Sequence, residues 1–278
     1  MIKFRAYEMI YGGKRMRFRA ILFSTLLILS ACSTSDSTVE ESSTKSNEEE
    51  TESVEQETET DPEEQKLLDN LPAEADLEDW NLILVNPWEA LPANFEPELV
   101  EVDNEQEIDA RIEDNWKDLK EAASEAGYNL FLASGYRSVE RQESNFNQTI
   151  QENMDEGLTE EEATEKAKEY LTEPGYSEHH TGLALDIVGD EWIMEGNGLV
   201  PEYDTQDSQE WLMEHMTDYG FILRYPENKE DLTGILYESW HFRYVGKENA
   251  EFITENDLAL EEYIELLEKQ EELAENNE

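Results

Sequence analysis

Two short segments of the chain each place a histidine near a carboxylate, and this pairing constrains the fold more than any other feature. Residues 176–186 read YSEHHTGLALD and contain His179 and Asp186. Residues 237–244 read YESWHFRY, in which Glu238 precedes His241 by three positions. Two imidazoles and one carboxylate can bind zinc and leave a fourth position open. The pattern predicts a metal site beside which Glu238 acts as a general base on water.

The spacing alone does not separate a metal site from ordinary core histidines. One imidazole in an apolar stretch is more often a hydrogen-bonded core residue than a ligand. His180 is an alternative ligand, because it stands directly beside His179. We interpret His215 as structural, because it lies in an amphipathic segment near Trp211 and Tyr219.

The composition excludes several classes of protein. The 278 residues include 70 acidic and 20 basic side chains, giving a formal net charge of -50. Nucleic-acid binders need clustered Lys and Arg, so we expect no nucleic-acid partner. This charge favours a soluble protein that resists association, and we expect a monomer. Cys32 is the single cysteine, which excludes an intramolecular disulfide and a thiolate metal cluster.

The N-terminus predicts a signal peptide over residues 1–32. Basic residues between Lys3 and Arg19 precede an apolar run at 20–29, which is shorter than the about 20 residues of a membrane-spanning helix. The sequence LSAC at 29–32 resembles a bacterial lipobox, which implies that Cys32 is acylated and anchors the chain to the outer face of the cell membrane. An uncleaved helix with a buried cysteine is the alternative. Translation could also start at Met16.

The rest of the chain divides into a tether and a folded domain. Residues 33–66 are rich in Ser, Thr, Glu and Asp, and such a segment buries too little apolar surface to fold. We expect a disordered acidic tether there and a folded domain over 67–278. Hydrophobic patterns predict strands at 80–86, 128–133, 183–188, 221–225 and 241–245. Helices are predicted through 108–123 up to Gly127, through 142–150, after a Thr159 cap, at 208–219 and at 258–273.

Four motifs together resemble the VanY-type zinc D-alanyl-D-alanine carboxypeptidases. They are SGYRS at 134–138, SEHHTGLALD at 177–186, GFILRYP at 220–226 and ESWHFRYVG at 238–246. They follow the family's order, and the similarity covers roughly residues 81–263. The resemblance implies an α+β fold, with a small, mainly antiparallel sheet flanked by helices and a zinc cleft. It also implies that Zn²⁺ is bound by His179, Asp186 and His241, with Glu238 as the catalytic base.

Two further site residues follow from the resemblance. Arg137 is implied to bind the substrate carbonyl and to act in catalysis, and Ser177 to hold the C-terminal end of the substrate. The chain departs from the family at Ser239, where Pro is common, and at His180, where Gln is common. Arg243 could pair with a carboxylate near the site or lie on a strand surface, and we leave it unassigned.

The resemblance implies a metallopeptidase that removes the C-terminal D-Ala from peptidoglycan stem peptides ending in D-Ala-D-Ala. Related zinc wall peptidases are the alternatives: a D-Ala-D-Ala dipeptidase or an L-Ala-D-Glu endopeptidase. A non-catalytic wall-binding lipoprotein is a third interpretation. It is disfavoured because a protein without catalysis has no need to keep all three predicted ligands and the base.

Overall fold

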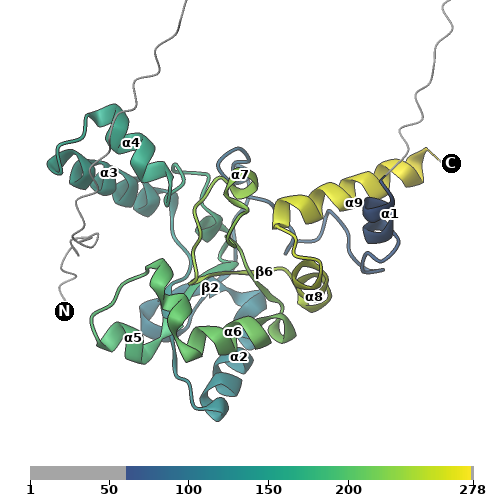
Figure 1. The fold of residues 1–278 in the computed structure, drawn as a ribbon, viewed down its shortest axis with the longest axis horizontal. Helices are drawn as coiled ribbons and strands as arrows, with labels where there is room; N and C mark the ends of the chain where they lie inside the picture. Colours follow the sequence, from purple (N-terminus) through teal and green to yellow (C-terminus); the bar gives the residue numbers. More distant parts are fainter. Residues whose placement is uncertain (1–60, 277–278) are drawn as a thin grey trace, which may run out of the picture. The chain divides into compact units, whose positions relative to one another are not determined.

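The computed structural model describes residues 61–276, which form an α+β domain (Figure 1). The predicted signal peptide, including Cys32, lies outside the described residues, as does most of the predicted tether. The first helix, α1 (Pro62–Leu68), overlaps the end of the tether segment. Its N-cap is Asp61, whose side chain accepts a hydrogen bond from the amide of Glu63, so the ordered part begins earlier than residue 67.

The central element is a four-stranded antiparallel sheet with the strand order β3-β4-β6-β5. Its strands are β3 (Leu130–Ser134), β4 (Ala184–Gly189), β6 (His241–Tyr244) and β5 (Phe221–Leu223). A small second sheet pairs β1 (Leu99–Glu101) with β2 (Glu107–Asp109). In the main sheet the register places Asp186 opposite His241 on one side and opposite Ser134 on the other. The pairing therefore fixes two predicted ligands next to each other.

Helices surround this sheet, as the predicted α+β class requires (Figure 1). Beyond α1, the α-helices are α2 (Glu113–Ala126), α3 (Val139–Asp155), α4 (Glu160–Lys168), α5 (Asp190–Met194), α6 (Asp207–His215), α7 (Glu230–Thr233), α8 (Lys247–Glu255) and α9 (Leu260–Glu275). The 3₁₀ helices are η1 (Asp103–Glu105), η2 (Ala110–Ile112), η3 (Glu178–Thr181), η4 (Pro201–Thr205) and η5 (Met216–Tyr219). The α3 and α4 helices pair as a hairpin, and α1 lies beside α9 (Figure 1).

Local sequence signals explain several of these boundaries. Gly127 ends α2 in the left-handed conformation at φ 98°, where a residue with a Cβ would be strained. Thr159 and Glu162 form the predicted capping box at the start of α4. One apolar core joins α2 to the main sheet through residues such as Trp116, Leu185 and Phe242. A second core packs α8 and α9 together, with Tyr263 fully buried.

The predicted strand at 80–86 is wrong. Leu82 and Val85 are buried, as the apolar pattern indicated, but the segment pairs with no strand. The carbonyl oxygens of Asn81 and Ile83 instead accept hydrogen bonds from Nη2 of Arg243, at 3.0 and 2.7 Å. A buried guanidinium thus satisfies main-chain groups that a neighbouring strand would otherwise have paired.

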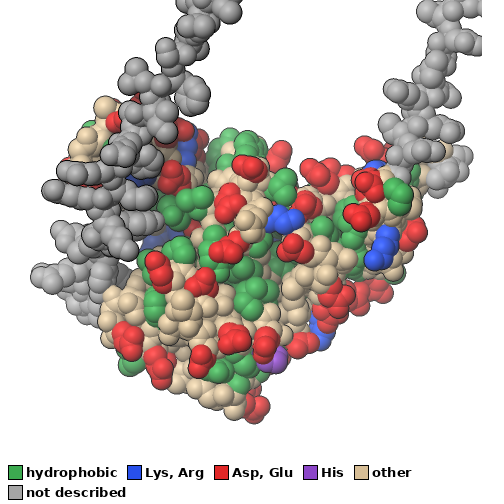
Figure 2. All heavy atoms as spheres, viewed as in Figure 1, with side chains coloured by type: hydrophobic (Ala, Val, Ile, Leu, Met, Phe, Trp, Pro, Cys, Tyr) green, Lys and Arg blue, Asp and Glu red, His purple; other side chains and the backbone are tan. Residues whose placement is uncertain are grey.

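Figure 2 shows acidic side chains scattered over the visible face, among fewer Lys and Arg side chains. Among residues 61–276, the helices all fall short of the length and apolar character that crossing a bilayer would require.

Candidate metal centre

The structure brings together the three side chains predicted to be metal ligands. His179 comes from η3, Asp186 from β4 and His241 from β6, and one ligand atom from each lies within 4.8 Å of the others. All three side chains are buried. The antiparallel register accounts for the pairing of Asp186 with His241, and the tight turn after η3 brings His179 to the same point.

The orientation of the His179 ring is fixed by a main-chain acceptor. Its Nδ1 donates a hydrogen bond to the carbonyl oxygen of Gly135 at 2.8 Å. Because a carbonyl can only accept, the proton must be on Nδ1, which leaves the lone pair on Nε2. That Nε2 lies 3.3 Å from Oδ2 of Asp186, so the unprotonated nitrogen faces the cluster.

The orientation of the His241 ring is fixed by a carboxylate, and here the outward-facing nitrogen is Nε2 instead of Nδ1. Its Nε2 donates to Oε2 of Glu178 at 3.3 Å, and its Nδ1 lies 3.2 Å from Oδ1 of Asp186. In both imidazoles, therefore, one nitrogen donates a hydrogen bond to an acceptor outside the cluster, and the other nitrogen faces Asp186. This is the outer-shell arrangement that orients metal-binding histidines in proteins.

The Asp186 carboxylate shows that the three residues fit a zinc ion. Its Oδ1 is buried and makes no hydrogen bond within the described part of the chain, although Nδ1 of His241 is close by. Burial would raise the pKa of Asp186, but His179 and His241 lower it well below its ordinary value, so the group is ionised. An ionised oxygen beside two imidazole lone pairs is a donor set that Zn²⁺ prefers.

Glu238 lies at the edge of this cluster. Its Oε2 is 3.4 Å from Nδ1 of His241, and its amide donates to the carbonyl oxygen of Tyr225 at 3.1 Å. Burial raises the pKa of Glu238, although the neighbouring His241 opposes this effect. A buried carboxyl group with a raised pKa is suited to accepting and releasing a proton near neutral pH.

Arg137 and Ser177 lie near the cluster without belonging to it. Arg137 Nη2 is 3.7 Å from Oδ2 of Asp186. The guanidinium also donates to Gln142 Oε1 at 2.9 Å and to Ser134 Oγ at 3.1 Å, so two further side chains hold it in place. Ser177 is buried directly before η3, where its side chain does not cap the helix.

The two remaining histidines are engaged elsewhere. The Nδ1 of His180 donates to the carbonyl oxygen of Arg137 at 2.6 Å, and its Nε2 accepts from the amide of Gly175 at 3.1 Å. With both ring nitrogens occupied, His180 braces the loops around the site and does not join the cluster. The His215 ring packs against Trp211 with ring centroids 4.7 Å apart and an interplanar angle of 40°, in agreement with a structural role.

A buried ionic network lies next to the centre, and sequence reasoning offered a carboxylate partner for Arg243 without identifying this network. The unassigned Arg243 is fully buried and donates to Oε1 of Glu178 at 2.6 Å, while Nε of Arg224 donates to the same oxygen at 2.7 Å. Glu261 of α9 accepts two further bonds from Arg224. The sequence signal for this network was the presence of Arg224 and Arg243 at or beside apolar strand segments. An arginine that is buried with its strand requires an acidic partner, so such a position predicts a buried ion pair.

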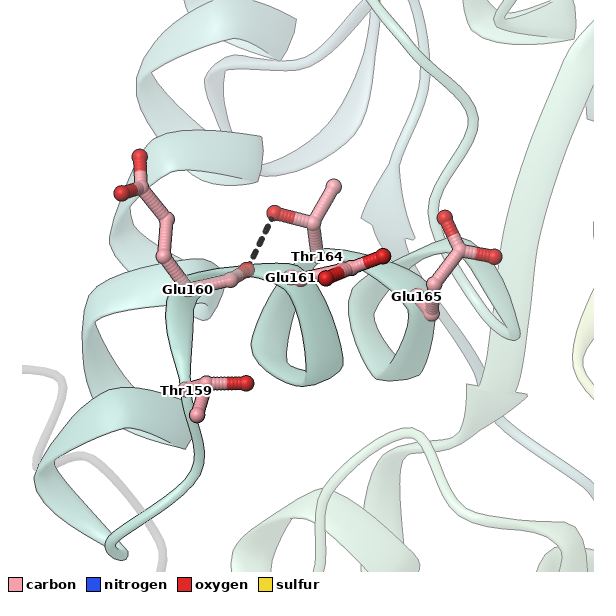
Figure 3. A pocket seen from close by; sticks show the side chains of 5 residues that line it. All are labelled: Thr159, Glu160, Glu161, Thr164 and Glu165. Carbon is pink, nitrogen blue, oxygen red and sulfur yellow. Dashed lines mark hydrogen bonds between the residues drawn. The ribbon is translucent and has the colours of Figure 1, made fainter.

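A separate hollow lies on the surface at the N-terminal end of α4 (Figure 3). It is lined by Thr159, Glu160, Glu161, Thr164 and Glu165. The Thr164 hydroxyl donates to the carbonyl oxygen of Glu160 at 2.7 Å, and Thr159 caps the helix. These polar groups serve the helix itself, and none of the cluster residues lines the hollow.

Comparison with known proteins identifies the family of this chain. Residues 105–247 match the family model described as VanY, D-alanyl-D-alanine carboxypeptidase. The chain belongs to this family. A D-alanyl-D-alanine carboxypeptidase of Enterococcus faecalis is 38% identical over 201 residues, which cover 72% of this chain and 72% of the relative. The resemblance stated from the four motifs is therefore confirmed, and the chain is a peptidase.

Solved structures agree with the fold and with the metal. A vancomycin resistance D,D-pentapeptidase, VanY from a VanB-type resistance cassette in complex with Zn(II), is 38% identical. It aligns with a TM-score of 0.61 over 67% of this chain and 99% of that protein. The LdcB LD-carboxypeptidase is 40% identical, with a TM-score of 0.58 over 68% of this chain and 87% of that protein.

The VanY family also includes members with another named activity. A bifunctional D-Ala-D-Ala dipeptidase and D-Ala-D-Ala carboxypeptidase, VanXYC of Enterococcus gallinarum, is 34% identical over 186 residues. The match covers 66% of this chain and 92% of that protein. Membership of the family thus establishes a carboxypeptidase-type peptidase but leaves the peptide bond to be assigned.

Proposed function

We propose that the chain is a zinc-dependent D,D-carboxypeptidase that removes the terminal D-Ala from peptidoglycan stem peptides ending in D-Ala-D-Ala. The observation that carries this proposal is the buried cluster of His179, Asp186 and His241, with Glu238 beside it. The 38% identity to a D-alanyl-D-alanine carboxypeptidase supports the choice of substrate.

The proposed roles follow from the geometry. His179 Nε2, His241 Nδ1 and the Asp186 carboxylate would hold the zinc ion. The chemistry that bound zinc supplies is Lewis-acid polarisation of water and of a carbonyl oxygen. Glu238 takes a proton from the attacking water and returns it to the departing amine, as its position beside His241 allows.

Arg137 and Ser177 act on the substrate in this proposal. The Arg137 guanidinium, held by Gln142 and Ser134, donates to the peptide carbonyl oxygen as negative charge develops there. A donor fixed before the reaction needs no reorganisation, which is the source of its effect. Ser177 holds the C-terminal end of the substrate, which is supported by its place two residues before His179.

The cellular location is also a proposal, and it rests on the sequence. The basic and apolar segments before Cys32 support export, and the LSAC sequence supports acylation of Cys32. We propose that the chain is anchored to the outer face of the cell membrane and acts there as a monomer. Incorporation of radiolabelled palmitate into the native chain, but not into Cys32→Ala, would test the anchor.

A second candidate is an L,D-carboxypeptidase, which the 40% identity to the LdcB LD-carboxypeptidase favours. The difference between the two lies in the residue before the scissile bond, which is a D-amino acid in one substrate and an L-amino acid in the other. Stem pentapeptide and stem tetrapeptide, each supplied as the only substrate, separate the two activities.

The test measures products from the metal-loaded chain. The proposal expects free D-Ala from the pentapeptide, loss of release with a chelator, and recovery when zinc is added back. Free D-Ala-D-Ala would indicate a dipeptidase, and release from the tetrapeptide alone would indicate an L,D-carboxypeptidase. His241→Ala is the control, because removal of one ligand should abolish both zinc binding and release. No cleavage of any wall peptide by a zinc-loaded chain would overturn the proposal.

A further inference from the structure

Glu178 is buried directly behind the metal centre, where its side chain contacts His241 and Arg243 of β6 and Arg224, which directly follows β5. Its side chain has 0% exposure, as do those of Arg224 and Arg243. It stands in η3 next to His179, yet it faces His241 of β6. A carboxylate is costly to bury, so every one of its oxygen contacts calls for an explanation.

The two oxygens of Glu178 have different partners. Oε1 accepts from Arg224 Nε at 2.7 Å and from Arg243 Nη1 at 2.6 Å. Oε2 accepts from Nε2 of His241 at 3.3 Å. The arginines therefore hold one end of the carboxylate, and the other end is left for the imidazole.

We propose that Glu178 is a positioning residue, which keeps the proton of His241 on Nε2 so that Nδ1 presents its lone pair to zinc. This inference rests on the proposed function and extends it to a residue outside the ligand set. A carboxylate bonded to the outer nitrogen of a metal-binding imidazole fixes the tautomer and the ring orientation and raises the basicity of the ligand.

Charge neutralisation explains why Oε1 of Glu178 accepts from two arginines, but it does not explain why Oε2 lies against Nε2 of His241. Arg224 already has a second carboxylate, because Glu261 accepts from its Nη1 at 2.8 Å and from its Nη2 at 2.6 Å. Arg243 also donates to three main-chain carbonyls, those of Asn81, Ile83 and Tyr244. Glu178 is the member of this network that contacts a ligand of the predicted zinc ion, whereas Glu261 contacts the network from α9.

The substitution Glu178→Gln separates the two roles. The amide oxygen would stay with the two arginines, because charge-assisted hydrogen bonds are the stronger ones. The amide NH₂ would then face Nε2 of His241 and require it to accept, which moves the ring proton to Nδ1. A protonated Nδ1 cannot bind zinc, and we expect zinc affinity to fall by about 10- to 100-fold.

The matched control is Glu261→Gln, which removes the other carboxylate of the network. It should lower the melting temperature of the metal-free chain and leave the zinc dissociation constant unchanged, because Glu261 does not contact an imidazole. Zinc dissociation constants would be measured on the full-length chain by competition with a chromophoric chelator, beside thermal unfolding of the metal-free proteins.

Three results would overturn the positioning role. The first is native zinc affinity in Glu178→Gln, and the second is an equal loss of affinity in Glu261→Gln. If Glu178→Gln does not fold, Glu178→Asp keeps the charge but shortens the side chain by one methylene, and unchanged zinc affinity in that variant is the third. Failure of the native chain to bind zinc would instead contradict the proposed function, so the two failures are distinguishable.

Discussion

Oε2 of Glu238 lies 3.4 Å from Nδ1 of His241, the ring nitrogen that also faces Asp186. The proposed base is therefore next to the candidate metal centre but is not one of the three side chains predicted to bind the metal. Removal of the base should for this reason be separable from removal of the metal.

Glu238→Gln keeps the size of the side chain and removes its ability to take a proton. We expect turnover of a D-Ala-D-Ala pentapeptide to fall by about 10²- to 10⁴-fold, the usual contribution of a general base. Zinc content, measured by atomic absorption, should remain that of the native chain. Native turnover in this variant would exclude Glu238 as the base, and loss of zinc would make it a ligand.

Arg137→Ala should reduce kcat/KM by about 10²- to 10³-fold, because a fixed donor to the developing oxyanion is lost. Arg137 is nearly buried, with 12% of its side chain exposed. The control is Arg141→Ala, an exposed arginine on α3, which should leave kcat/KM unchanged. Equal losses in both variants would mean that general charge, and not the position of Arg137, assists the reaction.

Gly182→Ala should destabilise the turn between His179 and Asp186. Gly182 has φ +72°, and a Cβ there would lie 2.8 Å from the amide nitrogen of Asp109. A left-handed conformation costs a residue with a Cβ about 1 to 3 kcal/mol, and the close contact adds to that. Gly157→Ala is the control, because Gly157 has φ +102° with nothing within 4 Å. Urea unfolding should show the larger loss for Gly182→Ala, and equal losses would remove the steric argument.

Tyr203 should make stability depend on pH in alkaline solution. Burial raises the pKa of Tyr203 from 10.0 to about 12, against a smaller opposing effect of Ser208. Between these values the folded chain keeps a proton that the unfolded chain releases. The free energy of unfolding should fall as pH rises, by up to about 1.4 kcal/mol per pH unit from this group. In urea unfolding at pH 9 to 12, the free energy of unfolding of Tyr203→Phe should fall less steeply with pH than that of the native chain. Equal slopes for the two proteins would contradict the assignment.

The clustering of His179, Asp186 and His241 could be predicted because the chain has only four histidines and the motifs occur in the family's order. Short apolar runs also located the four strands of the main sheet to within about two residues, since buried strands carry a strong hydrophobic signal. His179 and His180 could not be separated in this way. The choice between them depends on which ring reaches the carbonyl oxygen of Gly135 and which reaches that of Arg137.

The outer contacts of the site were beyond sequence reasoning for a physical reason. Glu178 of η3, Arg224 directly after β5 and Glu261 of α9 are far apart in the chain, and their side chains meet only in the folded protein. A charged residue beside an apolar strand indicates a buried partner but does not identify it. The wrong strand prediction at 80–86 has the same cause. The carbonyls of Asn81 and Ile83 accept from the Arg243 side chain, and the spacing of apolar residues cannot predict such a contact.

The ion pairs of Arg224 and Arg243 reach beyond the span that matches the family model, residues 105–247. Arg243 depends on the carbonyls of Asn81 and Ile83 before that span, and Arg224 depends on Glu261 after it. A fragment trimmed to the family match would retain every proposed ligand and still leave two guanidinium groups in the interior short of acceptors. The smallest portion able to fold by itself should accordingly be larger than residues 105–247, and a truncated form of this enzyme should keep the segments on both sides of that span.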